Sequence, residues 1–227
     1  MASDREILLY GMSANPPTGL QGHMGAIAHC QTLGFDEVWI LPVYQHIFST
    51  KRGLAPFEHR IAMSRIAIEE LPTASEDGPR LAAVDVKEYE RELFEHLAQI
   101  TDAAPEKLRV GSIDLIRYLR ERFPTYSFTM LLGADTFADL RGGKWKNGDE
   151  LQQLVKLLVM SRQGYEAPQP AEADAANDRV RFISIPSLSD ISSTYVRSVN
   201  DPEELRQVVT PRVAEYIMQH KLYGFML

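Results

Sequence analysis

One unit near the start of the chain limits the fold more than any other feature. Glu6–Tyr10 is a short apolar run typical of a buried strand, and Glu37–Leu41 is a second one rich in β-branched residues. Between them, Met24–Leu33 has the small and apolar residues of a helix. A strand, a helix and a strand in this order form a βαβ unit, whose two strands run parallel. The sequence therefore predicts an α/β fold with a mostly parallel sheet.

The rest of the chain continues this alternation. Further strands are predicted over Arg80–Val86, Tyr126–Leu132, Leu154–Met160 and Arg179–Ile185. Helices are predicted over Pro56–Leu71, Gly111–Glu121, Asp149–Gln153 and Pro211–His220, and one more helix opens at Ile191. We expect a single doubly wound, Rossmann-like domain over residues 1–227 that ends in C-terminal helices. Residues 166–178 are mostly small or acidic, without periodicity, which predicts a flexible surface loop.

Composition and charge exclude several classes of function. The chain has 24 Lys+Arg and 31 Asp+Glu, a formal charge of −7, which argues against a nucleic-acid partner. The apolar runs are too short to cross a bilayer, and the polar residues 1–6 do not resemble a signal peptide. The single cysteine, Cys30, cannot form an internal disulfide, and its apolar surroundings predict a small core residue. We therefore expect a cytoplasmic protein with no membrane partner.

The loop between the first strand and the first helix, residues 11–23, is the first candidate site. Its glycines and polar side chains are Gly11, Ser13, Asn15, Thr18, Gly19, Gly22 and His23. A Gly-rich turn from a strand into a helix offers free N–H groups and the positive end of the helix dipole to an anion. This loop, called the first loop below, is therefore a candidate phosphate site with His23 as an additional donor. The alternative is that the loop only connects two elements at the surface, because Gly and Pro also cluster in ordinary surface turns.

Two later segments are expected at the same edge of the sheet, where open α/β folds bind ligands. They are Gly133 and Asp135 after the strand Tyr126–Leu132, and Ser192, Ser193, Thr194 and Arg197 after the last strand. Hydroxyl and N–H groups in an opening helical turn beside an arginine suit a second anion, and Asp135 suits ribose hydroxyls. Taken alone, the serines and Asp135 would be ordinary helix caps. Together with the first loop they predict a nucleotide site.

Several common sites are absent from the sequence. It has no G-x-x-x-x-G-K-[ST] phosphate loop, no G-x-G-x-x-G dinucleotide motif and no G-x-S-x-G nucleophile elbow. His23 and His29 do not have the spacing of a helical metal pair, and no Cys/His cluster accompanies them. These absences exclude a P-loop NTPase and give no support to a dinucleotide-binding site or a structural metal site.

The longer motifs resemble the nucleotidylyltransferase superfamily, and within it the nicotinate or nicotinamide mononucleotide adenylyltransferases. Members carry G-x-[ST]-F-[DN]-P-x-[HT]-x-G-H in the first loop and a late I-S-S-T-x-x-R. This chain has G-M-S-A-N-P-P-T at 11–18, G-H at 22–23 and I-S-S-T-Y-V-R at 191–197. The segments L-G-A-D-T-F at 132–137, K-W at 144–145, S-R-Q-G-Y at 161–165 and P-R-V-A-E-Y-I-M-Q-H-K-L-Y at 211–223 are also similar. The resemblance covers nearly the whole chain.

The resemblance implies transfer of AMP from ATP to a pyridine mononucleotide, with release of pyrophosphate. It implies ATP as co-substrate, with Mg²⁺ bound mainly through the ATP phosphates. His23 would be the catalytic donor to the α-phosphate, and Thr18 would support it. The implied ATP contacts are Gly11, Ser13, Asn15, Gly22, His23, Gly133, Asp135, Ile191, Ser192, Ser193, Thr194 and Arg197. The implied contacts of the mononucleotide are Ser112, Trp145, His46 and Lys51.

The chain departs from the family pattern in the first loop. Ala14 stands where members have a larger side chain, and Gly19–Gln21 fill a slot that usually holds one residue. If the longer turn returns His23 to the α-phosphate, the protein is an enzyme; otherwise it is a nucleotide-binding regulator. A transferase of the phosphopantetheine type and a core role for Trp145 are further alternatives. The choice between nicotinate and nicotinamide stays open, as does a homo-oligomeric state.

Overall fold

The computed structural model describes residues 5–45, 53–73, 78–101, 107–161, 179–185, 187–189 and 191–225. The loop expected over 166–178 and the candidate residues His46 and Lys51 lie outside these ranges. Within them, every helix is too short or too polar to cross a membrane.

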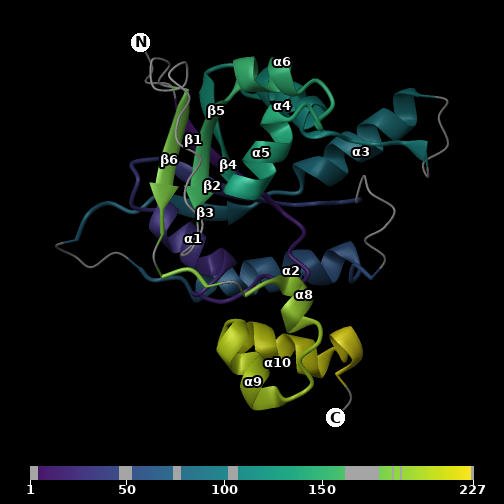
Figure 1. Ribbon diagram of the computed structural model, residues 1–227. Helices are drawn as coiled ribbons and strands as arrows, with labels where there is room; N and C mark the ends of the chain where they lie inside the picture. Colours follow the sequence, from purple (N-terminus) through teal and green to yellow (C-terminus); the bar gives the residue numbers. More distant parts are fainter. Residues whose placement is uncertain are drawn as a thin grey trace.

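Six parallel strands form one sheet (Figure 1). They are β1 (Arg5–Met12), β2 (Glu37–Pro42), β3 (Ala83–Val86), β4 (Tyr126–Gly133), β5 (Lys156–Ser161) and β6 (Val180–Ser184). The order is β3-β2-β1-β4-β5-β6, so the direction of winding reverses between β1 and β4. Ligands of such sheets bind at the carboxyl ends of the strands that flank this reversal. The first loop follows β1 and Gly133 ends β4, so the topology brings both candidate segments to that point.

Alternation along the strands divides the apolar residues between two faces of the sheet. In β1, Leu8 and Tyr10 join one buried cluster, whereas Ile7 and Leu9 join the other. The first cluster is covered by α1 (His23–Cys30), α2 (Phe57–Glu69), α8 (Ser193–Val196), α9 (Pro202–Val208) and α10 (Pro211–Gln219). The second is covered by α3 (Tyr89–Ile100), α4 (Ser112–Arg122), α5 (Ala134–Arg141) and α6 (Gly148–Leu154). The predicted doubly wound α/β fold is confirmed.

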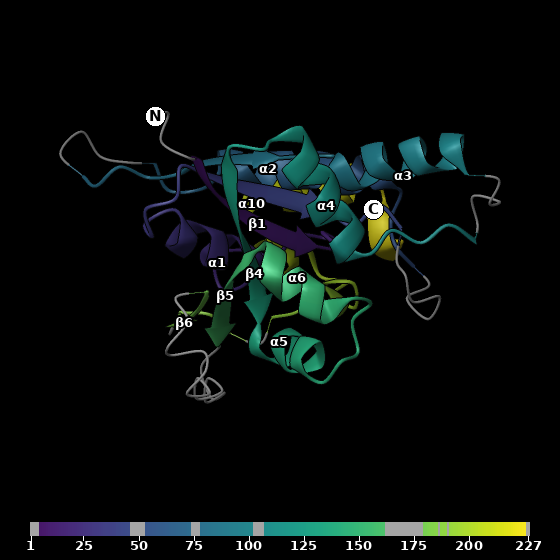
Figure 2. The same ribbon diagram turned by 90° about the horizontal axis from the view of Figure 1, so that it is seen from above.

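The C-terminal helices pack together near the edge of the sheet that carries the candidate site. Figure 1 places α8, α9 and α10 together at the end of the molecule toward which β6 points. A short helical turn, η2 (Leu222–Gly224), follows α10 and packs against it. In Figures 1 and 2, α3 extends sideways beyond the sheet. The C-terminal helices therefore lie close to the strand ends that carry the candidate site.

All six predicted strands are present, but three local expectations need correction. No helix was predicted directly after β4, but α5 begins at Ala134 and places Asp135 in its first turn. Leu154 ends α6, and the strand predicted from this residue starts at Lys156. The sequence analysis also names neither α3 nor α9, although each has a local signal. In α9, Asp201 caps the first turn through the N–H groups of Glu203 and Glu204, and Pro202 occupies the first helical position.

Cys30 is a core residue, as predicted. It is fully buried in α1, and burial raises the pKa of its thiol to about 12. The thiol is therefore protonated at neutral pH and behaves as a small apolar group.

Candidate active site

The lengthened turn of the first loop folds back so that Thr18 and His23 touch. The Thr18 hydroxyl lies 2.8 Å from His23 Nδ1, and the Thr18 backbone N–H donates to the same nitrogen at 3.1 Å. The backbone N–H of His23 donates to Thr18 Oγ1 at 2.8 Å. Thr18 is fully buried, whereas His23 is half-buried. The two residues expected to be catalytic are therefore held as one unit.

These contacts determine which ring nitrogen of His23 carries the proton in the neutral imidazole. A backbone N–H is only a donor, so Nδ1 must accept from Thr18 and cannot itself hold a proton. The proton of the neutral ring is then on Nε2. His23 is consequently set up as a hydrogen-bond donor through Nε2, which is the role that an oxyanion requires of a neutral histidine.

Glycines permit the close packing of the longer turn. A Cβ atom on Gly22 would lie 2.1 Å from Thr18 Oγ1, and one on Gly25 would lie 1.8 Å from the carbonyl oxygen of Leu20. The turn is also tied to distant segments, because Gly19 N donates to Val208 O and Gln21 O accepts from Ser189 N. The three residues Gly19–Gln21 are thus accommodated by the surrounding chain, and they do not displace His23 from Thr18.

Asn15 lies at the centre of the first loop and is 2% exposed. Its Oδ1 accepts from the Ala55 N–H and from the Tyr223 hydroxyl, each at 2.9 Å, and its Nδ2 donates to Gly53 O. The preceding residue, Ala14, is fully buried and has a positive φ of 50°, a conformation that large side chains adopt at a cost. The Asn15 side chain therefore faces other parts of the protein, and its contacts fix the loop.

The late segment packs directly on the first loop. Arg197 Nη1 donates to Asn15 O at 2.8 Å, and Ser193 Oγ donates to Pro16 O at 2.8 Å. Arg197 Nη2 also contacts Thr194 Oγ1 at 3.2 Å, and Ser192 Oγ caps α8 by accepting from Tyr195 N. The Ile191 carbonyl lies beside Gly22. The structure thus brings together the two segments that the sequence analysis assigned to phosphate groups.

The end of β4 brings a carboxylate to the same edge. Asp135 is exposed in the first turn of α5. A Cβ atom on Gly133 would lie 2.8 Å from Asp135 Oδ1, so the carboxylate lies close to the Gly133 backbone. Gly11, in the neighbouring strand β1, is exposed, and a Cβ on it would meet nothing within 4 Å. Ser13 follows β1 and is half-buried. Both strand ends at the winding reversal are therefore open and lined by small or polar residues.

Ser112 and Trp145 lie on neighbouring elements of the other face of the sheet. Ser112 begins α4, and Trp145 precedes α6 and packs, half-buried, against the second apolar cluster. Lys146 Nζ lies 3.4 Å from Asp114 Oδ2, which links the two elements. Trp145 therefore has one side in the core, and its half-buried ring leaves part of its surface for a ligand.

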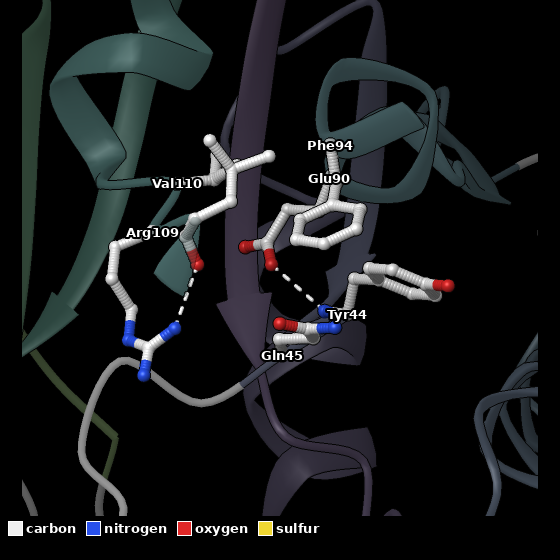
Figure 3. Close-up of a pocket in the computed structure, with 7 residues that line it drawn as sticks. Tyr44, Gln45, Glu90, Phe94, Arg109 and Val110 are labelled. Atoms are coloured by element: carbon white, nitrogen blue, oxygen red, sulfur yellow. Dashed lines mark hydrogen bonds between the residues drawn. The ribbon is translucent and has the colours of Figure 1, made fainter. Parts of the chain in front are cut away.

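A small pocket lies beside the carboxyl end of β2 (Figure 3). Its lining residues are Tyr44, Gln45, Glu90, Phe94, Leu108, Arg109 and Val110. Glu90 Oε2 accepts from the Tyr44 N–H at 2.9 Å, and Figure 3 shows the other oxygen of this carboxylate turned toward Val110 and Arg109. Burial raises the pKa of Glu90 to about 7, although the Tyr44 N–H and the charge of Arg60 act against the shift. A carboxyl group near this pKa can donate or accept a hydrogen bond at neutral pH.

Arg60 organises the carboxyl ends of β1 and β2, and the sequence analysis did not identify it. It is 1% exposed and donates to four backbone carbonyls, those of Ser13, Val43, Tyr44 and Ala55. Burial lowers the pKa of its guanidinium group, and the nearest carboxylates partly offset this. No local pattern distinguishes Arg60 from a solvent-facing arginine of α2, because its partners are backbone carbonyls and three of them, those of Ser13, Val43 and Tyr44, lie in earlier segments of the chain.

The donors at this edge are suited to an anion. They are hydroxyl groups, backbone N–H groups, His23 and Arg197, and Asp135 is the only carboxylate among the expected ATP contacts. Among the residues that the structure describes, no group of three or more His, Cys, Asp or Glu side chains could hold a metal ion. The site therefore places donors of a kind suited to a phosphate group near one carboxylate suited to hydroxyl groups.

Comparisons with known proteins agree with this geometry. Residues 9–199 match the family model described as cytidylyltransferase-like. A probable nicotinate-nucleotide adenylyltransferase of Anaeromyxobacter dehalogenans is 33% identical over 226 residues, covering 98% of this chain and 99% of the relative. A relative of the same name from Myxococcus xanthus is 27% identical, with 96% and 95% covered.

The solved structures show the same fold. The nicotinic acid mononucleotide adenylyltransferase of Plasmodium falciparum, complexed with NaAD, has a TM-score of 0.72 at 22% identity, with 98% of each chain covered. The same enzyme complexed with APC, an ATP analogue, gives the same TM-score. At this identity the likeness concerns the fold, and it extends over almost the entire chain.

Proposed function

This chain belongs to the cytidylyltransferase-like family and, within it, to the nicotinate-nucleotide adenylyltransferases of NAD biosynthesis, and we propose that it transfers AMP from ATP to nicotinate mononucleotide. The products would be the dinucleotide NaAD and pyrophosphate. The observation that carries the proposal is the contact between Thr18 and His23 at the winding reversal. The relatives' names favour nicotinate as the base, and nicotinamide mononucleotide is the second candidate.

His23 performs the central catalytic task in this proposal. The phosphate of the mononucleotide attacks the α-phosphorus of ATP, the bond from that phosphorus to the bridging oxygen breaks, and pyrophosphate leaves. The attacking phosphate is already anionic, so the reaction needs no strong base and no covalent intermediate. Negative charge grows on the oxygens around the α-phosphorus, and a preorganised Nε2–H donor stabilises it. Thr18 supports this donor by holding Nδ1 as an acceptor.

The remaining phosphates are assigned to the late segment. Arg197 is held at the first loop through Asn15 O and has further N–H groups for the β- and γ-phosphates. The opening turn of α8, with Ser192, Ser193 and Thr194, adds backbone donors. Asp135 accepts from the ribose hydroxyls. Because these side chains are donors suited to anions, Mg²⁺ would be held mainly by the triphosphate oxygens, and it would supply neutralisation of charge on the leaving pyrophosphate.

The mononucleotide is assigned to the part of the site formed by Tyr44, Glu90, Ser112 and Trp145, called the acceptor side below. Val110 lines the pocket of Glu90 and lies two residues before Ser112, and Lys146 links Trp145 to α4. These connections place Ser112 near both the pocket of Glu90 and the segment of Trp145. Trp145 would stack on the pyridine ring with the part of its side chain that the core leaves exposed.

The proposal is tested by measuring pyrophosphate release from ATP and Mg²⁺ with three acceptors. These are nicotinate mononucleotide, nicotinamide mononucleotide and phosphopantetheine. The fastest turnover is expected with nicotinate mononucleotide. Turnover with phosphopantetheine alone would establish the other transferase type, and ATP binding without turnover on any acceptor would establish a regulator.

A further inference from the structure

The last described turn of the chain reaches back to the first loop. Lys221 and Tyr223 both have positive φ angles, 51° and 57°, and Gly224 follows with 84°. Residues other than glycine adopt this conformation at a cost, so two of them in one turn persist only where other contacts hold them. Two such contacts are present: Phe225 is buried in the first apolar cluster, and the Tyr223 hydroxyl lies 2.9 Å from Asn15 Oδ1.

The direction of the hydrogen bond between Tyr223 and Asn15 follows from chemistry. Asn15 Oδ1 can only accept, so the Tyr223 hydroxyl must donate and must keep its proton. Burial raises the pKa of Tyr223, and the positive charges of Arg197 and Arg60 act against this shift without cancelling it. The hydroxyl is therefore a stable donor at neutral pH, close to two arginines that hold the strand ends.

Asn15 joins three segments of the chain at one residue. Its side chain binds Gly53 and Ala55, where the chain enters α2, as well as Tyr223 near the C-terminus. Its backbone oxygen accepts from Arg197. The side-chain contacts of Asn15 thus anchor the same residue whose backbone oxygen orients the Arg197 guanidinium group.

We propose that Tyr223 is a positioning residue for the ATP side of the site, acting through Asn15 on the first loop and on Arg197. The inference rests on the proposed function, because it takes the first loop and Arg197 as the ATP contacts. The strained C-terminal turn brings a donor to Asn15 that the first loop itself does not supply. The end of the chain is thereby coupled to the binding of ATP and not only to the packing of α10.

The first test is Tyr223→Phe, which removes only the hydroxyl group. Loss of one hydrogen bond predicts a fall of about three- to tenfold in kcat/KM for ATP. The KM for the mononucleotide should change by less than about twofold, because the acceptor side lies on other elements. The matched control is Tyr216→Phe, whose hydroxyl contacts His59 Nδ1 at 2.9 Å between α10 and α2. The control should lower the urea midpoint as much as Tyr223→Phe does and leave both kinetic constants unchanged.

A double-substitution cycle tests the route through Asn15. Asn15→Ala should weaken ATP binding, and adding Tyr223→Phe should change it by less than about twofold, because the shared contact is already lost. Independent, multiplicative effects of the two substitutions would overturn the inference, as would an unchanged kcat/KM for ATP in Tyr223→Phe.

Calorimetric titration with ATP, without an acceptor, separates this inference from the proposed function. A wild-type chain that binds ATP but is inactive with every acceptor would refute the transferase activity. In that case, weaker ATP binding by Tyr223→Phe than by Tyr216→Phe would still support the positioning role. Equal binding by the two variants would overturn it.

Discussion

The first loop and the acceptor side both lie at the carboxyl ends of parallel strands, but they are held in different ways. In the first loop, Thr18 and Asn15 are almost completely buried; Thr18 bonds to His23 within the loop, and the Asn15 side chain bonds to Ala55 and Tyr223 from distant segments. On the acceptor side, Ser112 and Trp145 are half-buried, and the neighbouring pair Lys146–Asp114 is a surface contact, with the Lys146 side chain 67% exposed. Such surface pairs contribute little stability. The difference indicates a rigid half for the phosphates, where charge develops, and an adaptable half for the acceptor.

The largest expected effect tests the rigid half. His23→Ala should lower kcat by about 100- to 1,000-fold, as for removal of one preorganised oxyanion donor. The rate of pyrophosphate release at saturating substrates measures this kcat. The control is His29→Ala, on the same helix α1 but in its last turn, which should retain the wild-type kcat. A His23→Ala variant with near-normal turnover would remove the basis for treating the first loop as catalytic.

The next effect concerns Glu90, a half-buried titratable group of the acceptor side. Its pKa is about 7 in the folded chain against an ordinary 4.5, so between these values the folded state holds a proton that the unfolded state has released. The unfolding free energy should therefore be greatest at the acid end of this window and fall as pH rises, by up to about 3 kcal/mol. Urea unfolding of the wild type and of Glu90→Gln at pH 5 and pH 8 measures this change in unfolding free energy. Equal pH dependence in both would show that Glu90 titrates normally.

Trp145 tests whether the acceptor side binds the ring. Trp145→Ala should raise the KM for the mononucleotide about thirtyfold, since stacking on an aromatic side chain contributes about 2 kcal/mol. The KM for ATP should change much less, and Trp145→Phe should recover most of the loss. Steady-state kinetics with each substrate varied in turn decides this. Equal increases in both KM values would assign Trp145 to the core.

The smallest expected effect concerns the Thr18 hydroxyl in the rigid half. Thr18→Val keeps the shape of the side chain but removes the hydroxyl that contacts His23, so kcat should fall about tenfold. Thr18→Ser retains the hydroxyl and should stay within about threefold of the wild type. If Thr18→Val has the same kcat as Thr18→Ser, the backbone N–H of residue 18 alone orients the imidazole.

Periodicity explains which elements could be predicted. The inner strands β1, β2, β4 and β5 contain the continuous apolar runs that a parallel sheet buried on both faces requires, whereas the edge strands β3 and β6 include Asp85 and Arg181. Helix α3 was missed although Tyr89, Leu93 and Leu97 recur every fourth residue between charged residues, which is the pattern of an amphipathic helix. Motif spacing placed His23, Asp135 and Arg197 at one edge of the sheet, and the strand order agrees with that placement.

The buried polar groups around the site could not be predicted in the same way. Arg60 and Glu90 sit among ordinary helical residues, and Tyr223 stood out only as part of a C-terminal resemblance. Their partners are backbone atoms and one amide that are far away in the sequence. Hydrogen bonds to backbone carbonyls leave no residue-type signature in the partner, so a single sequence does not reveal them.

The sequence by itself therefore determined the α/β class, the parallel sheet and the family, and it predicts the set of residues that would meet a nucleotide. Those conclusions depend on local patterns: apolar runs, glycine-rich turns and fixed motif spacing. Only the tertiary structure decided whether the longer turn keeps Thr18 and His23 in contact. That outcome depends on space and on partners supplied by Gly25, Val208 and Ser189, which the fold brings to the turn from elsewhere in the chain.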